Sequence, residues 1–401
     1  SEINSYLPGY NDKIIFENNE IIINFNKKKF LIKGDGKILI ADKSELFKYE
    51  IIKNNDQFRF DMKINLKNNK LLINFLDYEK KEGLESFINI KGIFKKKDQI
   101  KFDLISFEEK NNKILFKNLN LNKKFKIISI DSLRLNYNNN RNVQNQLYLK
   151  RENSNYTVKG SNFDASKMIN NIMNDHKENS SVFHNLNSKI YIKINKTYID
   201  KINFIKDLSG SLNFKNNEIS DLNLKSIFSN NKKIELSILT NDKQEKITKL
   251  FTGFPKPLIR RYDFIKGFDQ GYLNFYSVKK NKISNSVLVI DNFKIKEVPV
   301  FAKLLSLASL QGIADLLTGE GIRFTDFEMK FSNEKGLYQH SIEVFRLLQI
   351  KNKNNILTVH LSILNLQKST FLSSVGTFVV KAFLAGFMAY LMTALLADFV
   401  K

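Results

Sequence analysis

The sequence predicts a mostly β protein: a long antiparallel sheet, curled around an open groove, with a few amphipathic helices. Apolar and polar residues alternate with a period of two over most of residues 13–130, as in half-buried strands. Candidate strands recur about every 10 to 15 residues with almost no helical pattern between them, which argues against a parallel βαβ sheet. Uneven turns and the lack of a strict repeat favour an open sheet over a closed barrel.

The composition limits the chemistry that the chain can carry out. Its 401 residues include no Cys and only four His, so disulfides, thiolate zinc sites and His-rich metal clusters are excluded. The 42% of hydrophobic residues are enough to bury a core. We expect no metal and no cofactor, and a binding, transport or structural protein in place of an enzyme.

The net charge of +23 raises the question of nucleic-acid binding. Nucleic-acid-binding surfaces concentrate basic residues on one face and favour Arg. Here only eight residues are Arg, and the Lys residues are spread over the short polar stretches between apolar alternations. We interpret most of them as solvated turn residues and expect no nucleic-acid partner. A diffuse positive surface that attracts anionic lipid or nucleic acid is the alternative.

Two alternating sets of apolar residues are the candidate groove lining. The first set is Phe58, Phe60, Met62 and Ile64, and the second is Ile190, Ile192 and Ile194. After the first set, the polar residues 67–70 precede Leu71, Ile73 and Phe75, which predicts an antiparallel hairpin with an Asn-Asn turn. Asn216 and Asn217 predict a second such turn, between Phe214 and Leu222.

Two segments have helical periodicity. The first covers residues 164–173, with Asp164 as the N-cap and an apolar stripe that includes Met168 and Ile169. The second covers residues 299–318, begins at Pro299 and ends before Gly319. One face of this second helix carries Phe301, Leu304, Leu305, Ala308 and Gly312. Such an apolar helix must lie on a sheet end, in a groove or against a bilayer.

The region around this second helix resembles a known family. Residues 291–299, 304–315 and 319–324, with 261–268 and 271–273 upstream, are similar to the C-terminal region of AsmA-like proteins of the YhdP type. Residues 159–166 are similar to the middle region of the same family. The resemblance is specific over about residues 255–345 and looser over 130–255.

The resemblance implies a protein of the Gram-negative cell envelope, on the periplasmic face and anchored in the inner membrane. Its β-groove would bind phospholipids and pass them toward the outer membrane, with outer-membrane or other envelope proteins as further partners. We expect the family's N-terminal anchor to lie outside these residues. The second helix, residues 299–318, is the candidate groove end or membrane contact.

The C-terminal tail departs from the family after about Phe345, where a Gly-rich strand pattern is expected. Residues 375–397 are apolar apart from a few polar positions that include Lys381. The uninterrupted stretch 382–397 is about 24 Å long as a helix, shorter than a bilayer core, whereas 375–397 is long enough to span. A membrane helix, a buried or oligomerising helix and a shifted reading frame all remain open.

The chain divides into four predicted segments. These are the groove segment 1–160, a short helix with strands at 161–250, the AsmA-like region 251–345 and the tail 346–401. No nucleophile elbow, His-Glu-x-x-His or phosphate-loop pattern occurs, so we nominate no catalytic residue. The predicted function is phospholipid transfer, and the alternative is an assembly factor that binds outer-membrane polypeptides.

Overall fold

The computed structural model of the chain describes residues 7–8, 15–25, 29–55, 57–95, 99–169, 183–261, 267–281, 283–296, 321–334, 349–352 and 355–358. Strands dominate these ranges, as the alternating pattern predicts. Contacts between Cα atoms divide the described residues into two compact units. Of the described residues, the first unit contains those up to 202 together with 213–219, and the second contains 203–212 and 220–358.

The strands of the first half of the chain are β1 (Ile15–Phe25), β2 (Lys29–Ile40), β3 (Lys43–Asn54), β4 (Gln57–Asn65), β5 (Leu71–Ile73), β6 (Tyr78–Lys80), β7 (Phe87–Lys95), β8 (Gln99–Glu109), β9 (Asn112–Asn122), β10 (Ile127–Asn138), β11 (Gln144–Glu152), β12 (Asn155–Asp164) and β13 (Ser188–Tyr198). A 3₁₀ turn, η2 (Asn74–Leu76), lies between β5 and β6.

The remaining strands are β14 (Phe204–Lys215), β15 (Glu218–Phe228), β16 (Lys233–Thr240), β17 (Lys246–Thr252), β18 (Phe268–Lys280), β19 (Ile283–Ile295), β20 (Ile322–Glu334), β21 (Gln349–Asn352) and β22 (Asn355–Thr358). The helix α2 (Lys256–Arg261) lies between β17 and β18.

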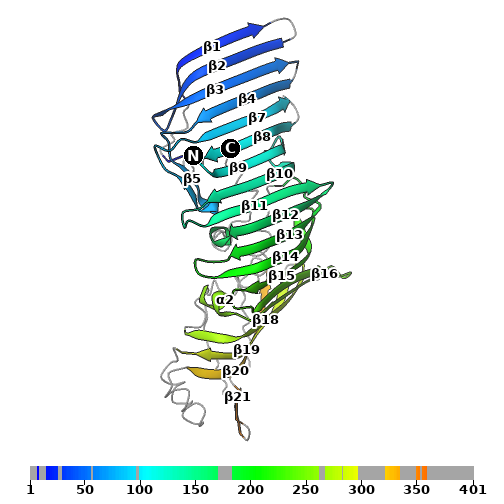
Figure 1. Cartoon of the computed structure of the whole chain (residues 1–401). Helices are drawn as coiled ribbons and strands as arrows, with labels where there is room; N and C mark the ends of the chain where they lie inside the picture. The colour runs from blue at the N-terminus through cyan, green and yellow to red at the C-terminus, as the bar shows by residue number, and fades with distance from the viewer. Residues whose placement is uncertain are drawn as a thin grey trace. The chain divides into compact units, whose positions relative to one another are not determined.

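Eighteen of the described strands belong to one sheet, and β5–β6 and β21–β22 form two small separate sheets. In the first unit, strands β1 to β4 and β7 to β12 pair in chain order and antiparallel. Figure 1 shows these strands side by side. Among the described pairings, β1 pairs with β2 alone and β20 with β19 alone, so the sheet is open. The predicted fold class, an open and mostly antiparallel sheet with few helices, is confirmed.

Among the described pairings of whole strands, that of β12 with β13 is parallel. The chain must therefore cross over between residues 165 and 187. The predicted first helix lies in this crossover: residues 166–169 are helical, and 170–173 lie outside the described residues. The Asp164 carboxylate accepts the backbone N–H of Ser166 at 3.1 Å, and Met168 is buried. A helical turn capped by Asp164 is therefore confirmed for this part of the segment.

The two predicted Asn-Asn turns have different outcomes. Asn216 and Asn217 both have positive φ, 51° and 67°, as a tight turn between β14 and β15 requires. The hairpin predicted across residues 67–70 is wrong, because β4 pairs with β3 and β7 while the short β5 pairs with β6. Asn69 is not part of a solvent-exposed hairpin turn, since its backbone N–H and its side-chain amide both donate to the Glu45 carboxylate.

The second unit has its own buried row of apolar side chains. Adjacent strands place them directly opposite each other, in the order Leu236, Leu250, Phe275, Leu288 and Met329.

Helix α2 contacts β18 through Lys256, whose Nζ lies 2.8 Å from Asp269 Oδ1. Lys296 lies 3.1 Å from the other oxygen of the same carboxylate. These two ammonium groups hold the pKa of Asp269 below its usual value, the hydrogen bond from Lys256 being the larger cause.

Gly92 marks a β-bulge that keeps the apolar face continuous. Lys91 pairs with Leu104 but Gly92 pairs with Phe102, so Asp103 is the extra residue. A Cβ at Gly92 would lie 2.3 Å from the Lys101 carbonyl oxygen and 2.7 Å from the Phe60 ring. Only glycine leaves room here for the two strands and the ring.

We predict that Gly92→Ala lowers the free energy of unfolding by about 2 kcal/mol, because a backbone oxygen must move to admit the methyl group. Urea unfolding followed by circular dichroism measures this change. Gly253→Ala is the control, since its nearest contact would be an ordinary 3.4 Å to Lys232 Cβ, and we expect a change within about 0.5 kcal/mol. Equal stabilities of the two variants would contradict the close approach at Gly92.

Candidate functional site

The two predicted groove sets lie on one face of the sheet in the first unit. Directly opposed partners on adjacent strands point to the same face, so the register can be followed from β4 to β13. One row runs through Ile64, Ile88, Phe107, Ile114, Leu135, Leu147, Gly160 and Ile194. A second row runs through Met62, Ile90, Ile105, Phe116, Leu133, Leu149, Val158 and Ile192.

We call this surface the apolar face, and the opposite surface of the first unit the polar face. Each row crosses eight strands, which at about 4.8 Å per strand makes roughly 34 Å. One leaflet of a bilayer holds its acyl chains within about 15 Å, half of the hydrocarbon core. The apolar face is therefore long enough for an acyl chain to lie across the strands.

The exposure of the apolar face changes along these rows. Ile190, Ile192 and Ile194 on β13 are fully buried, with at most 4% of their surface exposed. Phe58, Phe60, Met62 and Ile64 on β4 are half-buried. The β4 set is thus accessible from outside, whereas the β13 set is enclosed.

Beyond β4 the apolar face becomes open at β1. The register pairs Ile23 with Ile32, Ile32 with Ile51 and Ile51 with Phe60, so β1 continues the same face. On β1, Ile21, Ile23 and Phe25 are 51%, 53% and 80% exposed. The sequence prediction did not include these β1 residues. The run Ile21-Ile22-Ile23, which breaks the usual alternation, is the signal in the sequence that could have identified them.

An insert between β4 and β7, residues 66–86, covers part of the apolar face. It contains β5, η2 and β6, and Figure 1 shows β5 beside the sheet. The Tyr78 ring meets Phe107 and Tyr137 edge-on, with ring centroids 5.6 and 5.7 Å apart. Tyr137 also donates from its hydroxyl to the Leu76 carbonyl at 3.2 Å. Leu71, Ile73 and Phe75, which were predicted to form the second strand of a hairpin, pack in this cover together with Leu66, Leu76 and Tyr78.

Buried polar side chains attach the insert to the sheet. Glu45, on β3, accepts the backbone N–H of Lys67 at 2.9 Å and that of Asn69 at 2.7 Å. Lys80 has no exposed surface and donates to the carbonyls of Lys67 and Asn69 at 2.8 and 2.6 Å. Burial lowers the pKa of Lys80, while the carboxylates of Glu45 and Glu109 raise it.

Tyr78 adds a further polar attachment, because its hydroxyl donates to the Glu109 carboxylate. Burial is the larger cause of its raised pKa, and this hydrogen bond to the carboxylate raises it further. The sequence offers no local signal for this network, since Glu45 and Lys80 are ordinary charged residues until the insert folds over them.

A second polar cluster lies where β12 ends and the crossover begins. Asp164, 1% exposed, forms an ion pair with Arg141 and accepts from Asn139 Nδ2 at 2.6 Å. The Arg141 guanidinium also lies over the Tyr198 ring, 5.7 Å from its centroid. These contacts fix the crossover and satisfy the carboxylate, so we interpret the cluster as structural. The described residues contain no group of acidic or His side chains arranged to hold a metal ion.

The remaining predicted site residues cannot be assigned a structure. Phe301, Leu304, Leu305, Ala308 and Gly312 of the second predicted helix lie outside the described residues, as does the tail segment 375–397. In the described ranges, no helix has both the length and the apolar character needed to cross a bilayer.

Comparison with protein-family models, with curated proteins and with solved structures finds no match for this chain.

We predict that Lys80→Met lowers the free energy of unfolding by about 3 kcal/mol, because it leaves two backbone carbonyls without a donor and the buried Glu45 carboxylate without a nearby positive charge. Lys70→Met, in the same insert, is the control. Lys70 is exposed and pairs with Glu79 at 2.9 Å, so its loss should cost less than about 1 kcal/mol. Thermal unfolding of both variants measures the difference. A Lys80 variant as stable as the Lys70 variant would show that the insert is not held by this network.

Proposed function

We propose that the protein binds phospholipid on the apolar face of the first unit and passes it along the rows of apolar side chains. The observation that supports this proposal is the change in side-chain exposure along one continuous face. The apolar side chains are exposed on β1, half-buried on β4 and fully buried on β13. An acyl chain can contact the open part without any rearrangement of the buried core.

The energetics of this surface favour an aliphatic ligand. Each methylene that moves from water onto an apolar surface contributes about 0.8 kcal/mol. Contiguous exposed apolar patches of this kind mark sites for membrane, ligand or protein contact. The aromatic contacts of Phe60 with Phe102, at 5.9 Å, and of Phe16 with Phe47, at 6.0 Å, keep large rings on this face.

The polar face explains how such a sheet stays in water. Oppositely charged side chains pair across neighbouring strands there, with Lys33 2.7 Å from Glu50 and Lys91 2.7 Å from Asp61. The polar face therefore carries exposed ion pairs, together with a few exposed apolar side chains such as Ile22 and Leu46. Lipid headgroups would remain at the wet rim and acyl chains would lie on the apolar face.

The resemblance of residues 255–345 to AsmA-like proteins adds a setting to this proposal. According to this proposal, the protein works in the Gram-negative envelope, on the periplasmic face of the inner membrane, and carries phospholipid toward the outer membrane. The proposed transfer of phospholipid requires no cofactor and no catalytic residue, since it involves no covalent step.

A second candidate function rests on strand β1. Among the described pairings it has β2 on one side only, so its other edge offers backbone N–H and C=O groups to an added strand. Its exposed apolar side chains would contact alternate residues of that strand. An envelope assembly factor that binds unfolded outer-membrane polypeptides would use this edge.

We predict that the full chain, purified without detergent, carries phospholipid that native mass spectrometry and lipid extraction detect. Phe60→Asp should lower the bound lipid at least tenfold, because it introduces a charge on the apolar face. Gln57→Asp is the matched control: it adds the same charge on β4, on the polar face, and should leave lipid binding unchanged.

Three results would count against lipid binding: a well-folded wild-type protein without lipid, equal loss in both variants, or no loss in either. Recovery of bound polypeptide in place of lipid would favour the assembly-factor alternative. Circular dichroism of each variant separates lost binding from lost folding.

We also predict selectivity for acyl chains over headgroups, because the contacts are apolar. In competition between lipids of equal chain length, different headgroups should bind within about threefold of each other, whereas shortening each chain by two methylenes should weaken binding about tenfold or more. Displacement of a fluorescent fatty acid measures both series. A strong headgroup preference at constant chain length would contradict apolar recognition.

A further inference from the structure

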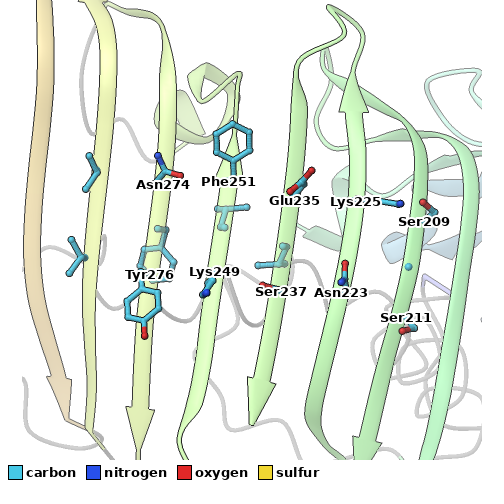
Figure 2. A pocket seen from close by; sticks show the side chains of 16 residues that line it. Ser209, Ser211, Asn223, Lys225, Glu235, Ser237, Lys249, Phe251, Asn274 and Tyr276 are labelled. Carbon is cyan, nitrogen blue, oxygen red and sulfur yellow. The ribbon is translucent and has the colours of Figure 1, made fainter. Parts of the chain in front are cut away.

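The second unit has a hollow on the polar side of its sheet, and the lining also includes Leu236, Leu250 and Phe275 of the buried apolar row. Its volume is about 920 Å³, within the range of ordinary ligand sites, and strands β14 to β19 line it. Figure 2 shows the side chains that border it, projecting from the strands into one shared space.

The strand register places the side chains that line this hollow in two rows of directly opposed residues. One row is Asn223, Ser237, Lys249, Tyr276 and Val287. The other is Lys225, Glu235, Phe251, Asn274 and Val289. Ser209 and Ser211 border the hollow from β14, on either side of Gly210.

Gly210 lets β14 approach β15 closely at this point. Its φ is +147°, and a Cβ there would lie 1.9 Å from the Asn223 carbonyl oxygen. Any other residue would push β14 away from β15 and change the wall of the hollow.

The uncharged polar side chains of the hollow have unused hydrogen-bonding capacity. The side chains of Ser209, Ser211, Asn223 and Ser237 have no hydrogen-bond partner among the described residues. On the polar face of the first unit, comparable side chains satisfy each other, as in Asn120 with Ser129 at 2.8 Å. In the hollow, hydroxyl and amide groups thus converge without being paired.

Apolar side chains lie among these polar groups. Tyr276 is 42% exposed, and Phe251, Val287 and Val289 are half-buried although they point to the polar side. Lys249 Nζ lies 5.9 Å from the centroid of the Tyr276 ring and helps to orient it. The hollow therefore presents exposed rings next to free hydroxyl and amide groups.

The charge of the hollow is nearly balanced, with Lys225 and Lys249 against Glu235. A hollow on the polar face of the first unit differs in this respect: its lining includes Arg134, Lys159 and Lys193 and no carboxylate. A phosphate-bearing ligand would suit that all-cationic lining. The hollow of the second unit suits a neutral ligand.

We propose that the hollow of the second unit binds a neutral oligosaccharide. A sugar ring has hydroxyl groups at its rim, which match the free Ser and Asn side chains, and a C–H face, which can stack on Tyr276 or Phe251. A row of sugar rings lies across neighbouring strands, and each strand supplies one polar or aromatic contact. This site is independent of the lipid proposal, because it uses none of the residues of the apolar face.

Saturation-transfer difference NMR on the full chain tests the proposal with three neutral probes: the tetramer of N-acetylglucosamine, cellotetraose and maltotetraose. We expect saturation transfer to at least one of them. We expect Tyr276→Ala to weaken its binding about tenfold, which corresponds to about 1.4 kcal/mol. Asn223→Ala should weaken it as well, through the loss of an amide contact.

Tyr191→Ala is the matched control. Tyr191 is 44% exposed on the polar face of the first unit and has Lys189 Nζ 5.1 Å from its ring centroid, which closely resembles the pairing at Tyr276. Its loss should leave sugar binding unchanged. Failure of all three probes at millimolar concentration would overturn the proposal, as would equal effects of the two Tyr variants. Binding that disappears between low and high salt would also overturn it, because it would indicate an anionic ligand held by the lysines.

Discussion

The pairing register of the sheet is the constraint on which the rest of this structure depends. Side chains alternate between faces with a period of two, so a slip of one residue in any pairing would move a whole strand's apolar set to the other face. Each of the two apolar rows of the first unit stays on one face across eight strands. Both the buried core and the accessible end of the apolar face follow from that continuity.

Bulges maintain this register where the sequence spacing departs from two. Ile127 and Ile130 are three residues apart, yet both are fully buried, while Ile128 between them is 37% exposed. The shift in pairing between Ile127 and Ser129 accounts for this, because it adds one residue on β10. The bulge at Gly92 does the same for β8, and it also strengthens the local twist that an open sheet of this length requires.

Covering an apolar face brings polar groups into the interior, and the first unit satisfies them locally. The insert at residues 66–86 carries its own charged residue, Lys80, which binds the backbone carbonyls of the same insert. Glu45 of the sheet accepts the N–H groups at the start of that insert. The result is a cover over part of the apolar face, whereas the apolar side chains of β4 and β1 stay accessible. Under the proposed function, the closed region would hold a lipid and the open region would exchange it.

The local sequence pattern alone determined much of the secondary structure of this protein. Alternation predicts the strands, the Asn216-Asn217 turn and the apolar identity of both groove sets, since period-two exposure and left-handed turns depend only on neighbouring residues. Strand partners were decided by the tertiary structure, because pairing depends on contacts between residues far apart in the chain. Residues 71–76 show the difference: their apolar pattern fits a strand as well as a cover, and the buried contacts of Glu45 and Tyr137 select the cover. The shared face of Met62 and Ile192, and the hollow lined by six strands, likewise exist only once the register is set.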